Sequence, residues 1–308
     1  MKIIDPHLHL FDLQQGQYDW LKPENPPFWP DKSIIHKSFS EKDLSLDDKT
    51  ILAGFVHIEA GFDNQQPCRE IEWLEEHCHK PFKSIAVIDL TLSSEQFLQA
   101  IVKLKGYRSV VGVRDILDDN ALEYLSNKQV IANLQQLAKQ KLIFELQMPL
   151  ENVTAVELLV SFLADNPSLN IIINHAGFPP YTAFNNNEES NDTQIDQKPL
   201  SDLNWLKRLK WLKWQQAIEK LSVFEQCSIK CSGFEMINQA YQPLWQLAVI
   251  NICIKYFGIN RVMLASNFPL CLFTGSYLEY WQQYMQGAFS QDELNKLCFK
   301  NAEKIYKF

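Results

Sequence analysis

Two histidines near the start of the chain have the spacing of a shared binding site. The stretch Asp5-Pro6-His7-Leu8-His9-Leu10 follows the apolar pair Ile3-Ile4. If residues 2–4 enter a β-strand, His7 and His9 point to the same face, because side chains alternate along a strand. Two imidazoles on one face can hold one metal ion or contact one substrate oxyanion. The same pair can also be ordinary strand-end polar residues, so its meaning depends on the rest of the chain.

Other polar side chains follow later strand-like runs. His57 and Glu59 come at the end of the apolar run 51–58, and further groups end five later runs: Arg114, Glu145 with Gln147, His175, Lys230 or Ser232, and Asn267. Each has an ordinary structural explanation; Glu145, for example, could be a buried partner of Arg114. If the strands are parallel, their carboxyl ends meet at one edge, and the joint pattern then indicates a site there.

Eight short apolar runs alternate with helix-like segments and must position these groups. The expected strands are 2–4, 51–58, 84–90, 109–114, 142–146, 170–174, 227–231 and 261–264. Helices are expected at 66–79, 93–105, 130–140, 153–164, 205–221, 241–257, 277–287 and 291–306, from the spacing of their apolar residues. Strands rich in Val, Ile and Leu suit a parallel sheet buried on both faces. Eight such units predict a single-domain α/β fold, the (β/α)8 TIM barrel. The alternative is a doubly wound open sheet, but no G-x-G-x-x-G follows any strand.

Two segments are expected to be irregular. Residues 12–49 contain dense prolines, which forbid a helix, and aromatic side chains such as Trp20. This loop is either a wall over a pocket or a loop anchored on the barrel. Residues 179–203 are polar and rich in Asn and Glu, which predicts an exposed insertion loop.

Composition excludes several classes of protein. The chain has 308 residues, of which 46% are hydrophobic and 21% charged, and its formal net charge is −8. This acidic balance argues against a nucleic-acid partner. Seven cysteines without a C-x-x-C pair indicate reduced thiols in a cytoplasmic protein. No apolar run has the length of a membrane span, and the N-terminus lacks the pattern of a secretory signal.

These residues resemble the amidohydrolase superfamily, in particular the amidohydrolase-2 group that includes sugar-acid lactonases and 2-pyrone-4,6-dicarboxylate lactonase. The resemblance covers nearly the whole chain. The segments that carry it are Asp5–Asp12, Tyr18–Leu21, Val56–Ala60, Glu70–Leu74, Gly112–Arg114, Phe144–Gln147, Asn174–Gly177, Lys230–Gly233, Ser266–Pro269 and Asn301–Tyr306.

The resemblance implies a hydrolase in which water attacks a carbonyl, most often that of a sugar-acid or dicarboxylic-acid lactone. It assigns metal or substrate binding to His7, His9 and His175. The strand-eight position is usually an aspartate that acts as general base, but here it is Asn267. An amide cannot take a proton from water at neutral pH, although it can orient a water or a substrate oxygen. The group has metal-dependent and metal-free members, so one divalent metal (Zn or Mn) and a metal-free site are both open.

A working mechanism follows from these assignments. His7, His9 and Arg114 bind and polarise a small, anionic substrate, because a guanidinium can hold a carboxylate through two hydrogen bonds. His175 or His57 replaces the missing aspartate as base, since imidazole titrates near neutral pH. Further substrate contacts are expected from Glu59, Glu145, Gln147 and Trp20. Two alternatives stay open: a non-catalytic small-acid-binding relative, which Asn267 favours, and a metal-dependent decarboxylase. The sequence names neither the substrate nor the oligomeric state.

Overall fold

The computed structural model describes residues 1–181 and 202–308, and in these ranges eight parallel strands form one sheet in chain order. The strands are β1 Lys2–Leu8, β2 Ile51–Ile58, β3 Phe82–Val87, β4 Val110–Ile116, β5 Ile143–Gln147, β6 Ile171–Ile173, β7 Cys227–Cys231 and β8 Val262–Leu264. The two edges of the sheet meet where a parallel bridge joins Leu8 to Phe268 and the His9 N–H donates to the Phe268 carbonyl at 2.7 Å. The expected (β/α)8 TIM barrel is therefore confirmed.

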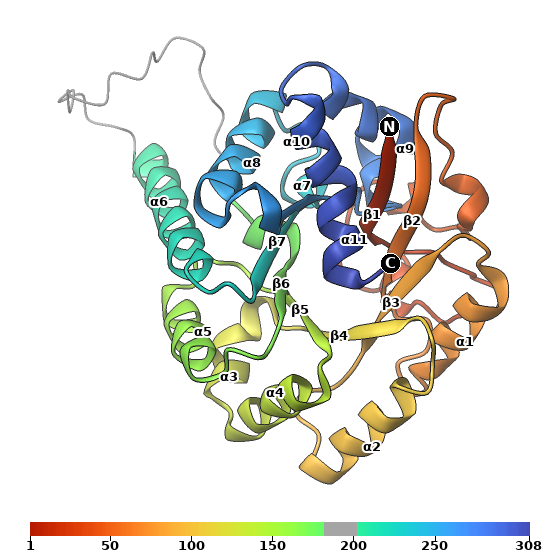
Figure 1. Cartoon of the computed structure of the whole chain (residues 1–308), viewed down its shortest axis with the longest axis vertical. Helices are drawn as coiled ribbons and strands as arrows, with labels where there is room; N and C mark the ends of the chain where they lie inside the picture. Colours follow the sequence, from red (N-terminus) through yellow and green to blue (C-terminus); the bar gives the residue numbers. More distant parts are fainter. Residues whose placement is uncertain (182–201) are drawn as a thin grey trace.

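Helices lie outside the strands and alternate with them along the chain (Figure 1). They are α1 Cys68–His77, α2 Ser94–Leu104, α3 Ala121–Ser126, α4 Lys128–Gln140, α5 Val153–Asp165, α6 Asp202–Ser222, α7 Phe234–Ile237, α8 Pro243–Phe257, α9 Tyr277–Gln282, α10 Gln291–Asn295 and α11 Asn301–Tyr306. Ser93, Asn127 and Asn152 cap the starts of α2, α4 and α5 with their side-chain oxygens, which satisfies otherwise unpaired N–H groups.

Two expected helices differ from the structure, and one further helix was not expected. The segment 291–306 is not one helix, because a π-helical turn at Lys296–Lys300 separates α10 from α11. The helix expected to reach residue 287 ends at Gln282 and continues as a short 3₁₀ turn. The helix that begins after Asn127 is preceded by α3, which the sequence did not indicate.

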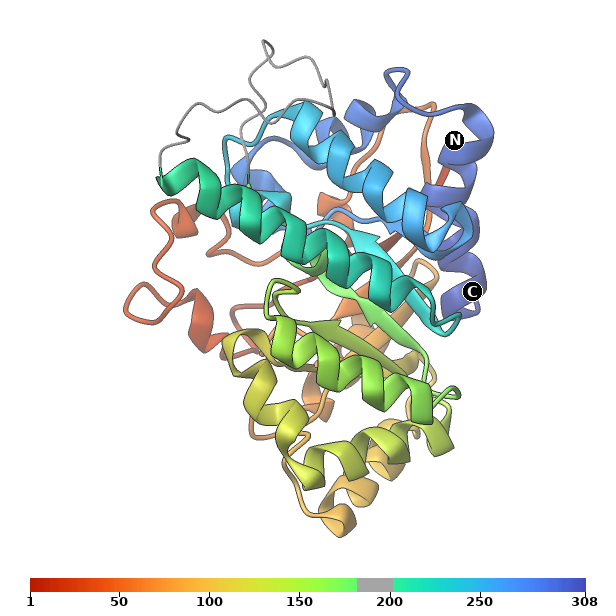
Figure 2. The same cartoon turned by 90° about the vertical axis from the view of Figure 1, so that its left-hand side faces the viewer.

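The segment 12–49 is a long connection between β1 and β2. It contains three short 3₁₀ turns and no α-helix, as its prolines predict. Buried Lys32 ties it together, because its ammonium donates hydrogen bonds to the carbonyls of Trp20, Lys22 and Asn25. Figure 2 shows this segment on the side of the barrel opposite the two termini. Most of the other expected loop, 179–203, lies outside the described residues.

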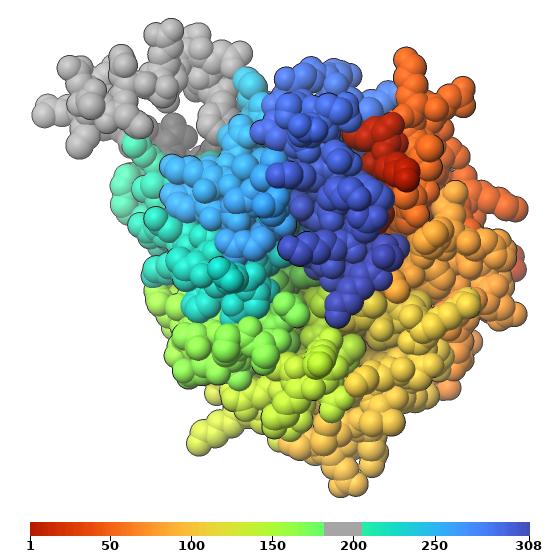
Figure 3. Space-filling model, viewed as in Figure 1, coloured from red at the N-terminus to blue at the C-terminus, as the bar shows by residue number. Residues whose placement is uncertain are grey.

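The end of the barrel opposite the segment 12–49 is closed. Apolar side chains from several strands, including Ile4, Val56 and Ile85, form one interior cluster with Phe299 and Tyr306 of the C-terminal segment. Full burial of each such side chain contributes about 1.5–3 kcal/mol. In Figure 3 the C-terminal segment covers the middle of this face. Any site inside the barrel must therefore open at the other end, where the strands have their carboxyl ends. In the described ranges, none of the helices has the length and apolar character needed to cross a membrane.

Candidate functional site

Three histidines meet at the carboxyl ends of β1 and β6. The ring centroid of His7 lies 5.2 Å from that of His9 and 4.6 Å from that of His175, and all three side chains are buried. His9 Nδ1 lies 2.8 Å from the Ile58 carbonyl, so it carries the hydrogen and leaves the Nε2 lone pair free to accept. Neither nitrogen of His7 has a hydrogen-bond partner among the described residues. Because buried polar groups almost always have a partner, His7 is a candidate to contact a ligand.

The three imidazoles are neutral at pH 7. Burial is the main reason why the pKa of each lies well below its usual value near 6.5. The positive charges of Arg114 and Lys230 lower the pKa of His7 and His175 further. Neutral imidazoles offer one N–H and one lone pair each, which suits contact with a carbonyl oxygen or a water.

The backbone around His175 is strained and is held by the end of β7. After β6, residues 175–177 all have positive φ, with His175 at 52° and Gly177 at 68°. Such values for a non-glycine residue are costly and persist where the surroundings impose them. His175 Nδ1 lies 3.0 Å from Ser232 Oγ, and a Cβ at Gly233 would stand 2.4 Å from the same nitrogen. Ser232 and Gly233 therefore fix the position of the His175 ring.

Arg114 is paired inside the protein. Its Nε donates to Glu59 Oε1 at 2.7 Å, Nη2 donates to the Glu59 carbonyl at 2.8 Å, and Nη1 donates to Gln147 Oε1 at 2.9 Å. All three side chains are buried. The two-bond grip expected for a substrate carboxylate is thus made to Glu59 instead. One Nη1 hydrogen is left for a ligand, because a guanidinium has five N–H donors.

Glu145 does not pair with Arg114, the ordinary structural explanation that the sequence left open for it. It accepts hydrogen bonds from Lys230 Nζ at 2.6 Å and from the Tyr306 hydroxyl at 2.6 Å, and both charged side chains are fully buried. Burial lowers the pKa of Lys230 to about 8, while the charge of Glu145 opposes that shift. Both Glu145 oxygens are used within the barrel, which makes Glu145 a part of the fold rather than a strong candidate for substrate contact.

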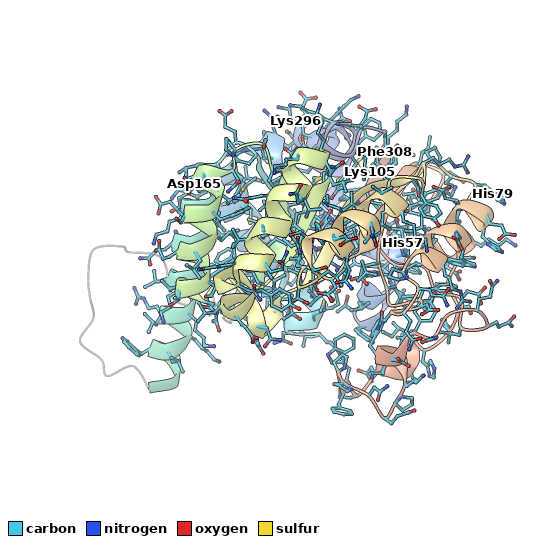
Figure 4. The ribbon with its side chains drawn as sticks, turned by 90° about the horizontal axis from the view of Figure 1, so that it is seen from below. His57, His79, Lys105, Asp165, Lys296 and Phe308 are labelled. Atoms are coloured by element: carbon cyan, nitrogen blue, oxygen red, sulfur yellow. The ribbon has the colours of Figure 1, made fainter. Side chains whose placement is uncertain are left out.

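Both ring nitrogens of His57 also have hydrogen-bond partners within the protein. Its Nδ1 accepts the Leu10 N–H at 3.2 Å, and its Nε2 donates to Glu70 Oε1 at 3.1 Å. Glu70 accepts the Ala60 N–H as well, at 2.8 Å. In Figure 4 His57 is labelled near the middle of the molecule, whereas His79 lies at its edge. With no nitrogen left over, His57 orders the loop after β2 and is a poor candidate for the base.

Trp20 lies in the loop over the mouth of the barrel. Its indole N–H donates to the Ala60 carbonyl at 2.7 Å, and its ring packs edge-to-face on Trp29. Trp29 in turn packs on Phe273, and both line a cavity of about 180 Å³. Trp20 therefore packs against Trp29, a residue of the cavity wall, while the cavity lining itself does not include Trp20.

Asn267 has a partner that the sequence did not reveal. Its Nδ2 donates to Glu235 Oε1 at 2.6 Å, and its backbone N–H donates to the His7 carbonyl at 2.9 Å, which places it beside the histidines. Glu235 is 2% exposed and lines the same cavity as Trp29. Burial raises the pKa of Glu235 to about 7. The sequence feature that could have indicated Glu235 is its place, two positions after the strand-seven motif that ends at Gly233.

The donor set does not fit a metal ion as it is arranged. Within residues 1–181 and 202–308, no three His, Cys, Asp or Glu side chains form a group that could hold one. Asn267 replaces the carboxylate expected at strand eight, and its neutral amide brings no negative charge for a dication. The charges that act on His7 and His175 come from the cations Arg114 and Lys230. Divalent metals favour sites that supply anionic oxygen or several aligned imidazoles, so this site suits a neutral or oxygen-bearing ligand better.

Comparison with known proteins identifies the family. The family model described as amidohydrolase matches residues 4–308. A protein of Sinorhizobium fredii described as uncharacterized is 26% identical over 319 residues, which cover 99% of this chain and 98% of that protein. An amidohydrolase from Burkholderia multivorans, solved with bound HEPES and also with bound zinc, has a TM-score of 0.73 at 16% identity over the full length of both chains.

A probable 2-pyrone-4,6-dicarboxylic acid hydrolase from Acinetobacter baumannii, solved with citric acid bound, has a TM-score of 0.68 at 19% identity, again over both full lengths. At such low identity these structures show a shared fold. The match of the family model to nearly every residue goes further: the chain belongs to the amidohydrolase family.

Proposed function

We propose that this protein hydrolyses a small carbonyl substrate, a lactone of a sugar acid or dicarboxylic acid, at the carboxyl ends of the barrel strands. The observation that carries the proposal is His7: a buried, neutral imidazole with two unpartnered nitrogens, placed between His9 and His175. A polar group in this state is stabilised when a ligand oxygen binds to it. Membership of the amidohydrolase family supports an enzyme.

In this proposal the histidines bind and polarise the lactone carbonyl. An N–H of His7 donates to the carbonyl oxygen, on which negative charge develops as water attacks. His9 offers its Nε2 lone pair to a hydroxyl or water, because its Nδ1 hydrogen is bonded to Ile58. His175, expected as a base, has a pKa so lowered that it is a weak proton acceptor, and we assign it substrate contact instead.

Arg114 determines how strongly the site can bind a negatively charged substrate group. An anionic group would meet a guanidinium whose charge is already paired with the Glu59 carboxylate and which also donates to the neutral Gln147 amide. We propose a single hydrogen bond from Nη1 to the substrate, with Gln147 and Glu59 holding the guanidinium in place. This arrangement favours a substrate with one weakly held carboxylate or hydroxyl at that end.

The test is a pH-indicator assay over a panel of sugar-acid and dicarboxylate lactones. We expect turnover by the native protein and a loss of about 100-fold or more in kcat/KM for His7→Ala, as for removal of a donor to a developing oxyanion. His79→Ala, an exposed histidine outside the site, is the matched control and retains activity. Circular dichroism confirms that both variants are folded. Equal activity of His7→Ala and native protein would contradict the assignment of the site.

The same assay decides the question of a metal. We propose metal-free turnover, which continues in the presence of a chelator and does not rise with added Zn or Mn. Loss with chelator and recovery with either metal would instead assign His7, His9 and His175 as ligands. Tight binding of a substrate acid without turnover would favour a non-catalytic relative, and release of carbon dioxide from an unsaturated acid would favour a decarboxylase.

A further inference from the structure

Hydrolysis at this site needs a proton acceptor that the strand-eight residue cannot provide. The amide of Asn267 has no basic lone pair at neutral pH. His57 has both nitrogens bonded within the fold, and the pKa of His175 lies well below 6.5. A general base works best when its pKa lies near the working pH, so His175 does not suit the role. Asn267 and His57 do not suit it either, because neither has a free basic atom.

Glu235 is the carboxylate that the fold brings to this position. It belongs to α7, the short helix that follows β7 directly through Ser232 and Gly233. In this connection, Ser232 contacts His175 at the end of strand six, and Glu235 contacts Asn267 at the end of strand eight. The segment after β7 therefore links the two sides of the site. A carboxylate at this point stands 2.6 Å from the residue that occupies the usual base position.

One oxygen of Glu235 has no partner. Oε1 accepts the hydrogen bond from Asn267, whereas Oε2 is buried without a hydrogen bond to any described residue. The cavity of about 180 Å³ that Glu235 lines is walled by Trp29, Met236 and Phe273 among others, and it has room for water or a small substrate group. A buried carboxylate oxygen without a partner, in a residue that lines a cavity, is where a bound water would complete the hydrogen bonding.

The charge on Glu235 is not neutralised by a cation. Among the described residues it forms no ion pair, and the titratable groups whose pKa it raises are Tyr241, Tyr280 and Cys271. These three groups are neutral at pH 7, because the pKa of each lies above its ordinary value. Desolvation of Glu235 is therefore opposed only by hydrogen bonds, and its pKa of about 7 follows.

We propose that Glu235 is the general base of the hydrolase, acting on a water that Asn267 orients; the inference rests on the proposed function. Asn267 donates through Nδ2 to Glu235 and keeps its Oδ1 as acceptor for the water. As the water oxygen bonds to the lactone carbonyl carbon, Oε2 takes one water proton. The ring C–O bond then breaks, and the leaving oxygen takes that proton from Glu235. The product is the open-chain hydroxy acid, and the carboxylate is restored.

The experiment compares native protein, Glu235→Gln, Glu235→Asp and the surface control Glu157→Gln on a lactone that the native protein hydrolyses. Removal of a general base typically costs 10²–10⁴-fold, so we expect a loss of about that size in kcat for Glu235→Gln with KM changed by less than about threefold. Glu235→Asp retains part of the rate. Glu157, on the outer face of α5, pairs with Lys220, and its variant matches the native rate.

The pH profile separates a catalytic role from a structural one. Activity requires ionised Glu235, so native kcat/KM falls as the pH drops through about 7. Glu235→Gln lacks this limb in its residual activity, whereas a merely structural loss would scale the whole curve and keep the limb. If Glu235→Gln fails to fold, the native profile still decides, because absence of a limb near pH 7 overturns the proposal.

The outcomes also distinguish the two proposals. Active native protein with unimpaired Glu235→Gln overturns the role of Glu235 and leaves the hydrolase intact. A native protein that turns over no lactone in the panel overturns the hydrolase, and the role of Glu235 falls with it. Native turnover, a pH limb near 7 and its loss in Glu235→Gln together support both.

Discussion

Buried polar side chains at the mouth of this barrel fall into two groups according to their partners. His57, Arg114 and Glu145 use their polar atoms on other residues of the fold. His7 and one oxygen of Glu235 have no partner among the described residues. Because an unsatisfied buried group costs about 1–3 kcal/mol, the second group is expected where a ligand or water completes it. At the mouth of the barrel, the hydrogen-bond partners thus distinguish His57, Arg114 and Glu145, which hold the site together, from His7 and Glu235, which we propose to contact the ligand or water.

This division predicts that His57→Ala harms stability more than catalysis. The substitution leaves the Leu10 N–H without its partner and the buried Glu70 carboxylate with only the Ala60 N–H. We expect the free energy of unfolding to fall by about 2–4 kcal/mol, measured by urea denaturation. The kcat of the folded variant stays within about tenfold of native, well above that of His7→Ala. Native stability with abolished turnover would return His57 to the list of catalytic candidates.

At the scale of elements, the positions of the strands were predictable from the sequence, but the ion pairs between side chains on different strands were not. Apolar runs with breaks between them indicated all eight strands, because buried parallel strands are continuously apolar. The strand register makes Arg114 and Glu145 neighbours, yet Glu145 pairs with Lys230 of β7. Residue spacing identifies which groups share one end of a barrel, but it does not say which of several cations a carboxylate reaches across the interior. Glu235 escaped notice because α7 has only four residues, too few for a helical pattern.

The connection after β7 offers a test at this scale. Gly233 and Gly258 both have positive φ, 67° and 72°, but only at Gly233 would a Cβ meet a site residue, His175. We expect Gly233→Ala, in the left-handed helical region, to lose about 1 kcal/mol of stability from backbone strain, and Gly258→Ala, whose ψ of 149° lies next to a region essentially restricted to glycine, to lose about 1–3 kcal/mol. Gly233→Ala additionally displaces His175 and lowers kcat/KM at least about tenfold, since an active-site shift near 1 Å is costly.

Thermal unfolding and lactone turnover of the two glycine variants check this prediction side by side. Gly258 has nothing within 4 Å of the position a Cβ would take, so its variant reports the backbone cost alone. Equal activity of the two alanine variants would show that the position of His175 does not depend on Gly233.

The whole molecule is closed at one end and open at the other. The C-terminal segment brings Tyr306 into the barrel interior, where its hydroxyl donates to Glu145. Lys230 and Glu145 thus form a fully buried ion pair beneath the three histidines, and Lys230 is one of the charges that lower the pKa of His7. Polar groups in the interior therefore link the closed end of the barrel to the site at its mouth.

This buried pair predicts strong coupling between its two members. Lys230→Met leaves Glu145 without its cation, and breaking a buried pair in this way costs about 3–5 kcal/mol. The double variant Lys230→Met with Glu145→Met removes both charges, so we expect it to be more stable than either single variant. On the surface, Lys220→Met breaks the exposed pair with Glu157 and costs less than about 1 kcal/mol. Urea denaturation at pH 7 of the native protein, the two interior single variants and the double variant measures the coupling free energy. Additive effects of the two interior substitutions would show that Lys230 and Glu145 do not stabilise the fold as an ion pair.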